Sequence, residues 1–359
     1  MPLKPLPEIV KALLAPGIGR RTPEETAFFA HALVPVAATK TGQELLRVAA
    51  DRGVSLRFDS GIIRPPTVAA TTGGVIIFGQ HPQLSSIGMG QFMLSLVHEL
   101  AHVRQFANGF ENAAFIRDSH PEDALLVLKM LEAEATATAL QVGWEMYQAG
   151  ETRPIGAMLA PGFQHAPAVQ AFRDRVMVEG SWAVMDGSAK AAACAAWFGE
   201  EAVVSYYEEE GIRNARRVVG SVVQEAHRKR GVLRQMLSEN HEFSLPGHFL
   251  AGTRLANDLP LCRRFMEVFS ERDGSCPLME HMGGVDHVLG DRFRKLHHPD
   301  GTRLMAGLMG DWGNARITLA ALENRLRQEL RGEGILVPPS GPVLKIRPRR
   351  FPMPQGRLR

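Results

Sequence analysis

Cysteine is scarce in this sequence of 359 residues, in which Cys194, Cys262 and Cys276 are the three present. They lie far apart, so the sequence lacks the CxxC pairs that structural zinc sites and redox dithiols use. It also lacks a run of about 18 uninterrupted apolar residues, the length that a membrane helix needs. Its first apolar stretch is interrupted by Glu8 and Lys11, which argues against a secretory signal. These absences predict a cytoplasmic protein without a membrane span.

Acidic residues are absent from residues 334–359, which contain six Lys or Arg residues. Because the whole chain carries a net charge of +3, the remaining residues carry −3. The segment is rich in proline and poor in residues that could pack, so it predicts a disordered tail. Phe351 is its only aromatic side chain for base stacking and no recognition fold adjoins it. We therefore expect no specific nucleic-acid partner.

The spacing of apolar residues predicts helices followed by a small sheet near the start of the chain. Residues 23–51 have helical periodicity with a break at Pro35. Residues 54–59 alternate between apolar and polar side chains, and residues 67–70 and 75–78 flank the turn Thr72-Gly73-Gly74. These segments predict a short antiparallel sheet.

Two long helices are predicted after the sheet. Residues 90–108 have apolar side chains at helical spacing, and Gly109 follows as a C-cap. Ser119 and Glu122 fit a capping box at the start of the second helix, which extends to Gly150 and would be about 45 Å long. Further helical segments are predicted at residues 167–178, 182–198, 200–208, 211–230, 259–272 and 315–331.

The segment His98-Glu99-Leu100-Ala101-His102 carries the clearest chemical signal. Residues four apart lie on the same face of a helix, so the two imidazoles can bind one metal ion. Zinc accepts nitrogen ligands, and a catalytic zinc keeps one position open for water. Glu99 lies to the side of these ligands, where its carboxylate can take a proton from that water. The pattern predicts a catalytic Zn²⁺ site with Glu99 as the general base.

A third protein ligand must come from elsewhere in the chain. The HExxHxxGxxH extension is absent, because Gln105 stands at its Gly position and Asn108 at its third His position. The second long helix offers Glu132 and Glu134 among small residues, which allow two helices to pack closely around a metal. The two carboxylates are about 200° apart around the helix. We prefer Glu132 as the third ligand, and Glu134 is the alternative.

The sequence HELAHVRQ, followed after about thirty residues by LEAEATATALQ, resembles the gluzincin-like metallopeptidase domains of unknown function found in bacterial proteins. The resemblance covers residues 45–150 firmly and the remainder weakly. In gluzincins an Asp four residues after the ligand Glu often supports the first His, and Thr136 occupies that position here. The resemblance therefore leaves the supporting carboxylate unassigned.

Together these features predict an α+β fold of the zincin type, with the small antiparallel sheet packed on the HExxH helix and the Glu-bearing helix. We expect an N-terminal helical segment over residues 1–44 and a zincin-like metallopeptidase core over residues 45–160. A mainly helical region would follow over residues 161–333, and the basic tail over residues 334–359.

The predicted function is hydrolysis of a peptide or protein substrate by a zinc-activated water, with residues 75–78 offering backbone groups to the substrate. A donor for the oxyanion is also needed, and Tyr206, Tyr207 and His241 are unranked candidates. The alternative function is a scaffold or interaction protein that keeps a zinc-stabilised zincin fold with little or no turnover.

Two other groups of residues carry weaker chemical signals. His281, His287, His297 and His298 have no metal-site spacing, and a polar turn is favoured for the last two. Cys194 lies in an Ala-rich segment without a His at a helpful spacing, so we expect a packed helix there and not a nucleophile.

Overall fold

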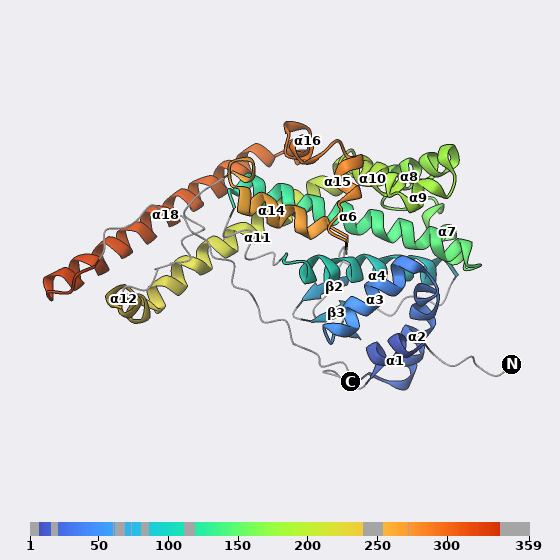
Figure 1. Ribbon diagram of the computed structural model, residues 1–359, viewed down its shortest axis with the longest axis horizontal. Coiled ribbons are helices and arrows are strands. Elements are labelled where there is room, and N and C mark those ends of the chain that lie inside the picture. The colour runs from blue at the N-terminus through green and yellow to red at the C-terminus, as the bar shows by residue number, and fades with distance from the viewer. Residues whose placement is uncertain are drawn as a thin grey trace.

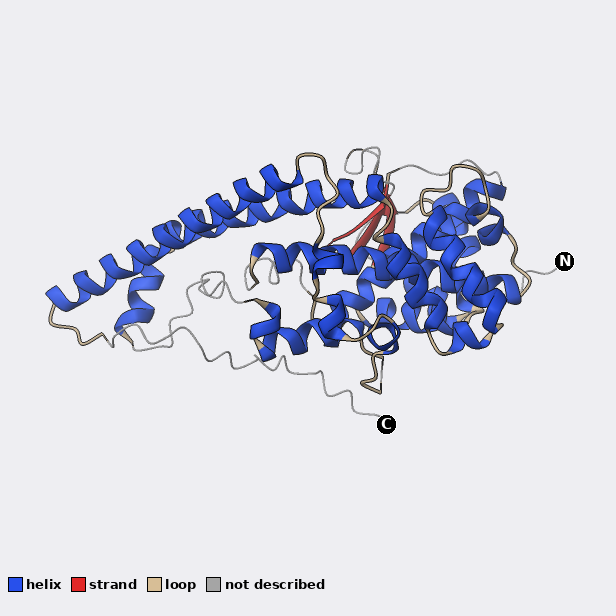
Figure 2. Ribbon diagram, turned by 90° about the horizontal axis from the view of Figure 1, so that it is seen from above, coloured by secondary structure: helices blue, strands red, loops and turns tan. Residues whose placement is uncertain are grey.

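The computed structural model of the protein describes residues 7–15, 21–59, 61, 69–72, 74–79, 86–110, 119–239, 254–271 and 273–337. These residues form a mostly helical α+β structure with one small sheet (Figures 1 and 2). The strands are β1 (Ser55–Phe58), β2 (Ala69–Thr72) and β3 (Val75–Phe78). The first helices are α1 (Glu8–Leu14), α2 (Pro23–Ala37), α3 (Lys40–Asp51), α4 (Ser86–Ala107), α6 (Pro121–Gln148), α7 (Arg153–Met158), α8 (Ala166–Glu179), α9 (Trp182–Met185) and α10 (Ser188–Trp197). They are followed by α11 (Glu201–Arg228), α12 (Arg230–Ser238), the 3-10 helix η1 (Leu255–Asn257), α14 (Leu259–Phe269), α15 (Pro277–His281), α16 (Val285–Val288), α17 (Asp291–Arg294) and α18 (Gly301–Gly332).

The sheet is mixed, so the prediction of an antiparallel sheet was wrong in part. The strand order is β1-β3-β2, with β2 antiparallel to β3 and β1 parallel to β3. Ile76, Ile77 and Phe78 of β3 are buried. A strand this apolar is stabilised by a central position in the sheet, between two neighbouring strands. The alternation of residues 54–59 correctly indicates a strand. The direction of this strand relative to β3 depends on how the chain connects the two strands and not on the alternation.

A cluster of phenylalanine rings joins the sheet to two helices. Phe58 of β1 and Phe78 of β3 pack against Phe28 and Phe29 of α2 and against Phe92 of α4. The ring centroids of Phe78 and Phe92 are 4.6 Å apart. Such aromatic pairs contribute about 0.5–1.5 kcal/mol each beyond the burial of their area. The cluster holds the sheet on α4, and β2 consequently lies beside the HExxH segment.

Helix α4 packs closely against both α6 and α7 (Figure 1). A Cβ added at Gly90 would lie 2.1 Å from the carbonyl oxygen of Arg153, so only glycine lets the backbones of α4 and α7 approach this closely. In α6 the small residues Ala133, Ala135 and Ala137 are all buried. The predicted long second helix is confirmed, but its N-cap is His120 and not Ser119, because Nδ1 of His120 accepts the backbone N–H of Glu122 at 3.4 Å.

Several helix boundaries differ from those predicted. The break in residues 23–51 falls after Ala37 and not at Pro35, since the Thr39 hydroxyl accepts the backbone N–H of Gly42 and starts α3. Residues 182–198 are split into α9 and α10 at Gly187, which has a φ of +84°. Residues 200–208 and 211–230 form the single helix α11, because Gly211 is buried within it, where Leu125 of α6 packs.

Helices α11 and α18 lie side by side and project from the rest of the molecule as a long arm, with α12 at its end (Figures 1 and 2). Helix α18 begins at Gly301, earlier than the predicted residue 315. Its buried Leu319 and Leu326 pack with α11 and α12, whereas Trp312 belongs to a cluster that also includes Ala124 and Leu125 of α6. Most of the predicted tail, residues 338–359, lies outside the described residues. No helix in the described ranges combines the length and the hydropathy needed to cross a membrane.

Candidate metal centre

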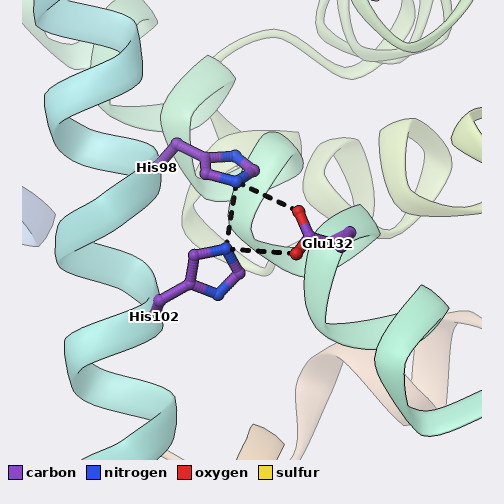
Figure 3. A group of neighbouring side chains, drawn as sticks. All are labelled: His98, His102 and Glu132. Atoms are coloured by element: carbon purple, nitrogen blue, oxygen red, sulfur yellow. Dashed lines mark hydrogen bonds and ion pairs between the residues drawn. The ribbon is translucent and has the colours of Figure 1, made fainter. Parts of the chain in front are cut away.

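Three side chains that can ligate a metal meet where α4 faces α6 (Figure 3). Nε2 of His98 lies 3.2 Å from Oε2 of Glu132, and Nε2 of His102 lies 3.5 Å from Oε1 of the same residue. The two Nε2 atoms are 3.0 Å apart. Among the described residues, no other group of three or more His, Cys, Asp or Glu side chains has this arrangement. The structure thus brings Glu132, and not Glu134, to the two histidines.

The separations of these atoms fit a small tetrahedral ion. Ligand atoms at about 2.0–2.1 Å from a tetrahedral metal lie about 3.3 Å from one another. The three separations of 3.0, 3.2 and 3.5 Å are all near this value. The side chains of His98, His102 and Glu132 are 17%, 12% and 21% exposed, so they are shielded from bulk water without being sealed off. The donor set is therefore suitable for a metal ion with one coordination position facing a cleft.

Electrostatics keep the carboxylate of Glu132 ionised. Burial raises the pKa of Glu132, but the imidazoles of His102 and His98 outweigh burial and hold that pKa well below 4.5. Burial lowers the pKa of His102, and the combined effect of Glu132, Glu99 and Gln105 raises it to about 9. A cation bound between these groups would interact with the same carboxylate, so metal binding would displace a proton from the site.

Glu134 belongs to a buried ion network behind the histidines. Its side chain is 3% exposed and pairs with Arg104 of α4 and Lys190 of α10, while the hydroxyl of Thr138 donates to it at 2.8 Å. Burial raises the pKa of Glu134, but Arg104 and Lys190 outweigh burial and lower it. The amide Nε2 of Gln105 also donates to Glu134, at 2.7 Å. Glu134 therefore connects three helices and is turned away from the imidazoles.

Glu99 is 6% exposed and lies against the edge of the sheet. The hydroxyl of Thr71 in β2 donates to Oε2 of Glu99 at 2.7 Å. The contact ties the carboxylate to β2, and Glu99 and the two histidines, which are on the same helix, line the same cleft. No sequence pattern pointed to Thr71, since its part in the site depends on how β2 packs on α4.

A cleft of about 910 Å³ opens over the three side chains. One wall is β2, the floor is α4 and α6, and the opposite wall is α11. Its apolar lining includes Leu94, Phe106, Leu131, Leu140, Phe163 and Val203, and its polar lining includes Thr71, Glu99, Glu132, His165, Tyr206, Tyr207 and Asn214. No Lys or Arg is among the described residues that line it. The cleft is thus large, partly apolar and without a Lys or Arg side chain in the described part of its wall.

The structure distinguishes two of the three candidate oxyanion donors. Tyr207 is partly buried, and its hydroxyl is within hydrogen-bonding reach of Glu132. Burial, followed by Glu132, raises the pKa of Tyr207 well above 10, so its hydroxyl stays protonated. Tyr206 lines the same cleft but is 39% exposed. His241 lies outside the described residues.

The remaining histidine and cysteine predictions concern packing. His297 and His298 lie in the loop before α18, where their backbone N–H groups donate to Glu208 at 2.7 and 2.8 Å. Cys194 is fully buried in α10, and burial raises the pKa of its thiol, as expected for a packed residue that is not a nucleophile.

Sequence reasoning missed one further polar pair in the cleft wall. His165 lines the cleft, and its Nδ1 lies 3.4 Å from Oε2 of Glu200, whose side chain is 4% exposed. The two residues are 35 positions apart at the starts of α8 and α11. No local pattern joins them, so only the packing of these helices shows that they form a pair.

The site defines a protein with a candidate metal centre at the bottom of a cleft. Over residues 22–216 the sequence matches the family described as "Putative metallopeptidase family (DUF6782)", and the chain belongs to this family. The match begins before and ends after residues 45–150, where the resemblance in the sequence is firm, and it includes α2, α3 and the first half of α11. Comparisons with curated proteins and with solved structures give no match.

Proposed function

We propose that the protein is a zinc-dependent peptidase of the zincin type, with His98, His102 and Glu132 as the metal ligands and Glu99 as the general base. The observation that supports this most strongly is the set of three ligand atoms at 3.0–3.5 Å from one another in a cleft. Membership of a metallopeptidase family adds independent support. When bound, zinc would supply a Lewis acid that polarises the scissile carbonyl and acidifies water.

The chain's own residues would perform the proton transfers. Glu99 accepts the proton of the attacking water and returns it to the leaving amine. The hydrogen bond from Thr71 holds Oε2 of Glu99 in place and leaves Oε1 as the oxygen that takes the proton. The hydroxyl of Tyr207 donates to the oxygen that becomes negatively charged in the transition state. This role needs a protonated hydroxyl, in agreement with the raised pKa of Tyr207.

The peptide substrate would bind along β2 and not along β3. We expected residues 75–78 to offer backbone groups, but β3 is paired on both edges, whereas β2 is an edge strand and lines the cleft. An extended peptide can add to such an edge through main-chain hydrogen bonds. Because no Arg or Lys stands among the described lining residues to bind a terminal carboxylate, we infer cleavage away from the substrate's C-terminus.

Metal analysis of purified single variants tests the ligand set. We expect stoichiometric zinc in the wild-type protein and in the Glu99→Gln and Glu134→Gln variants. Zinc should be lost from His98→Ala, His102→Ala and Glu132→Ala. If His98→Ala keeps its zinc, or if Glu134→Ala loses it while Glu132→Ala does not, the ligand assignment is wrong.

A peptide library incubated with the same proteins tests the activity. Wild-type protein should cleave some members, and Glu99→Gln should lower the rate at least about 100-fold, the usual contribution of a general base. Zinc bound without cleavage of any peptide would instead favour the alternative of a zinc-stabilised scaffold protein. Protein that binds no zinc would contradict both functions.

A further inference from the structure

We propose that Gln105, held by Glu134, fixes His102 in the tautomer that presents Nε2 to the metal. The inference rests on the proposed ligand set. Gln105 is fully buried and its side-chain oxygen Oε1 lies 2.8 Å from Nδ1 of His102. It is a positioning residue, because it contacts the ligand and not the metal.

The chemistry of its neighbours determines which way the Gln105 amide points. Its Nε2 donates to the backbone carbonyl oxygen of Leu131 at 3.0 Å and to Oε2 of Glu134 at 2.7 Å. Both partners act as acceptors, since one is a backbone carbonyl oxygen and the other is the carboxylate that Arg104 and Lys190 pair with. A reversed amide would place Oε1 against two oxygens. The amide is therefore held with Nε2 towards α6 and Oε1 towards His102.

The orientation of the amide then decides the tautomer of His102. Oε1 of Gln105 can only accept a hydrogen bond, so Nδ1 of His102 must carry the hydrogen. In the neutral imidazole the lone pair is then on Nε2, the atom that faces Nε2 of His98 and Glu132. The backbone of α4 places His102 near the site, and Gln105 determines which ring nitrogen His102 offers to the metal.

The buried cations behind Glu134 hold this arrangement in place. Arg104 precedes Gln105 on α4 and Lys190 reaches Glu134 from α10, so the carboxylate that orients the amide is itself tied to both helices. Glu134 thus acts on His102 through a relay of two hydrogen bonds, and the group that contacts His102 is the neutral amide of Gln105 and not a carboxylate. Histidine ligands usually donate to a carboxylate, a carbonyl or water, and loss of such a partner lowers metal affinity about 10–100-fold.

The first experiment measures zinc affinity by competition with a chromophoric chelator in Gln105→Met, which keeps the length of the side chain and removes the amide. We expect the dissociation constant to rise about 10–100-fold. Gln141→Met is the matched control, because the side chain of Gln141 in α6 is likewise hydrogen-bonded, to Thr41 and Glu145, and has no hydrogen bond to His98, His102 or Glu132. An unchanged dissociation constant in Gln105→Met, or an equal rise in both variants, would overturn the proposal.

The second experiment needs no substitution at Gln105. Long-range ¹H–¹⁵N NMR of the zinc-loaded protein, with the His102 signals assigned by their loss in His102→Ala, should show a hydrogen on Nδ1 of His102. A hydrogen on Nε2 would refute the relay. The same spectrum of the metal-free protein, recorded at a pH high enough for the imidazole to be neutral, tests the tautomer even if no metal binds. If the protein binds no zinc but Nδ1 of His102 carries a hydrogen, the result contradicts the proposed function and not the role of Gln105.

Discussion

The hydroxyl of Thr71 lies 2.7 Å from Oε2 of Glu99, and this hydrogen bond joins the edge strand β2 to the HExxH helix α4. The strand that would bind the substrate is thereby connected to the residue that would move the proton. A peptide added along β2 would lie beside Glu99 without any movement of the helix. The relationship supports a site in which substrate alignment and proton transfer depend on the same strand.

Replacing Thr71 should reduce catalysis without releasing the metal. Thr71→Val keeps the shape of the side chain and removes its donor to Glu99. A hydrogen bond to a charged group contributes about 1.5–3 kcal/mol, and we expect kcat/KM for a cleaved peptide to fall about tenfold or more. Thr72→Val, at an exposed position on the same strand, is the control and should leave kcat/KM unchanged. Loss of zinc from Thr71→Val would show instead that the residue supports the ligands.

The two adjacent tyrosines should differ in their effect on turnover. Tyr207→Phe removes the hydroxyl near Glu132, so kcat should fall about 100-fold, the usual effect of losing one oxyanion donor, while zinc content stays the same. Tyr206→Phe changes the more exposed residue and should have little effect on kcat. The comparison needs steady-state kinetics and metal analysis of both variants. A larger loss of kcat in Tyr206→Phe would reverse the assignment.

Glu134 should make the metal-free protein sensitive to acid. Its pKa in the folded chain is lowered below the ordinary value of 4.5, mainly by Arg104 and Lys190 acting against burial. A group with a lowered folded-state pKa stabilises the fold above its unfolded pKa, and this contribution is lost as the pH falls through the folded-state pKa. Glu134→Gln should therefore melt at a lower temperature than wild type at pH 7. The difference in Tm should shrink as the pH falls below 4.5, and a constant difference would contradict this explanation.

A second buried ion pair should affect stability and not the metal. The side chains of Lys129 and Glu208 are 0% exposed and 3.0 Å apart, and Glu208 also accepts the two N–H groups of the loop before α18. Glu208→Gln leaves the Lys129 charge without its partner, which should cost about 3–5 kcal/mol of unfolding free energy. Urea denaturation measures this loss. Glu209→Gln, which changes a half-exposed neighbour, should cost less than about 1 kcal/mol.

The sequence by itself determined the features that depend on local spacing. The positions of His98 and His102 four residues apart place both imidazoles on one face of a helix, whatever surrounds it. The apolar periodicity and terminal signals indicated α4, α6 and most later helices, and the run from Val75 to Phe78 indicated a strand. These properties arise from backbone geometry within about four residues, so a linear pattern can specify them.

Only the tertiary structure decided which groups meet across elements. The sequence favoured Glu132 and left Glu134 open as the alternative, and the rotation of α6 against α4 turns Glu132 to the histidines and Glu134 to Arg104 and Lys190. The direction of β1 and the contact between Thr71 and Glu99 likewise depend on packing. Such choices are set by burial and charge pairing between segments tens of residues apart, and those interactions leave no periodic trace in the chain.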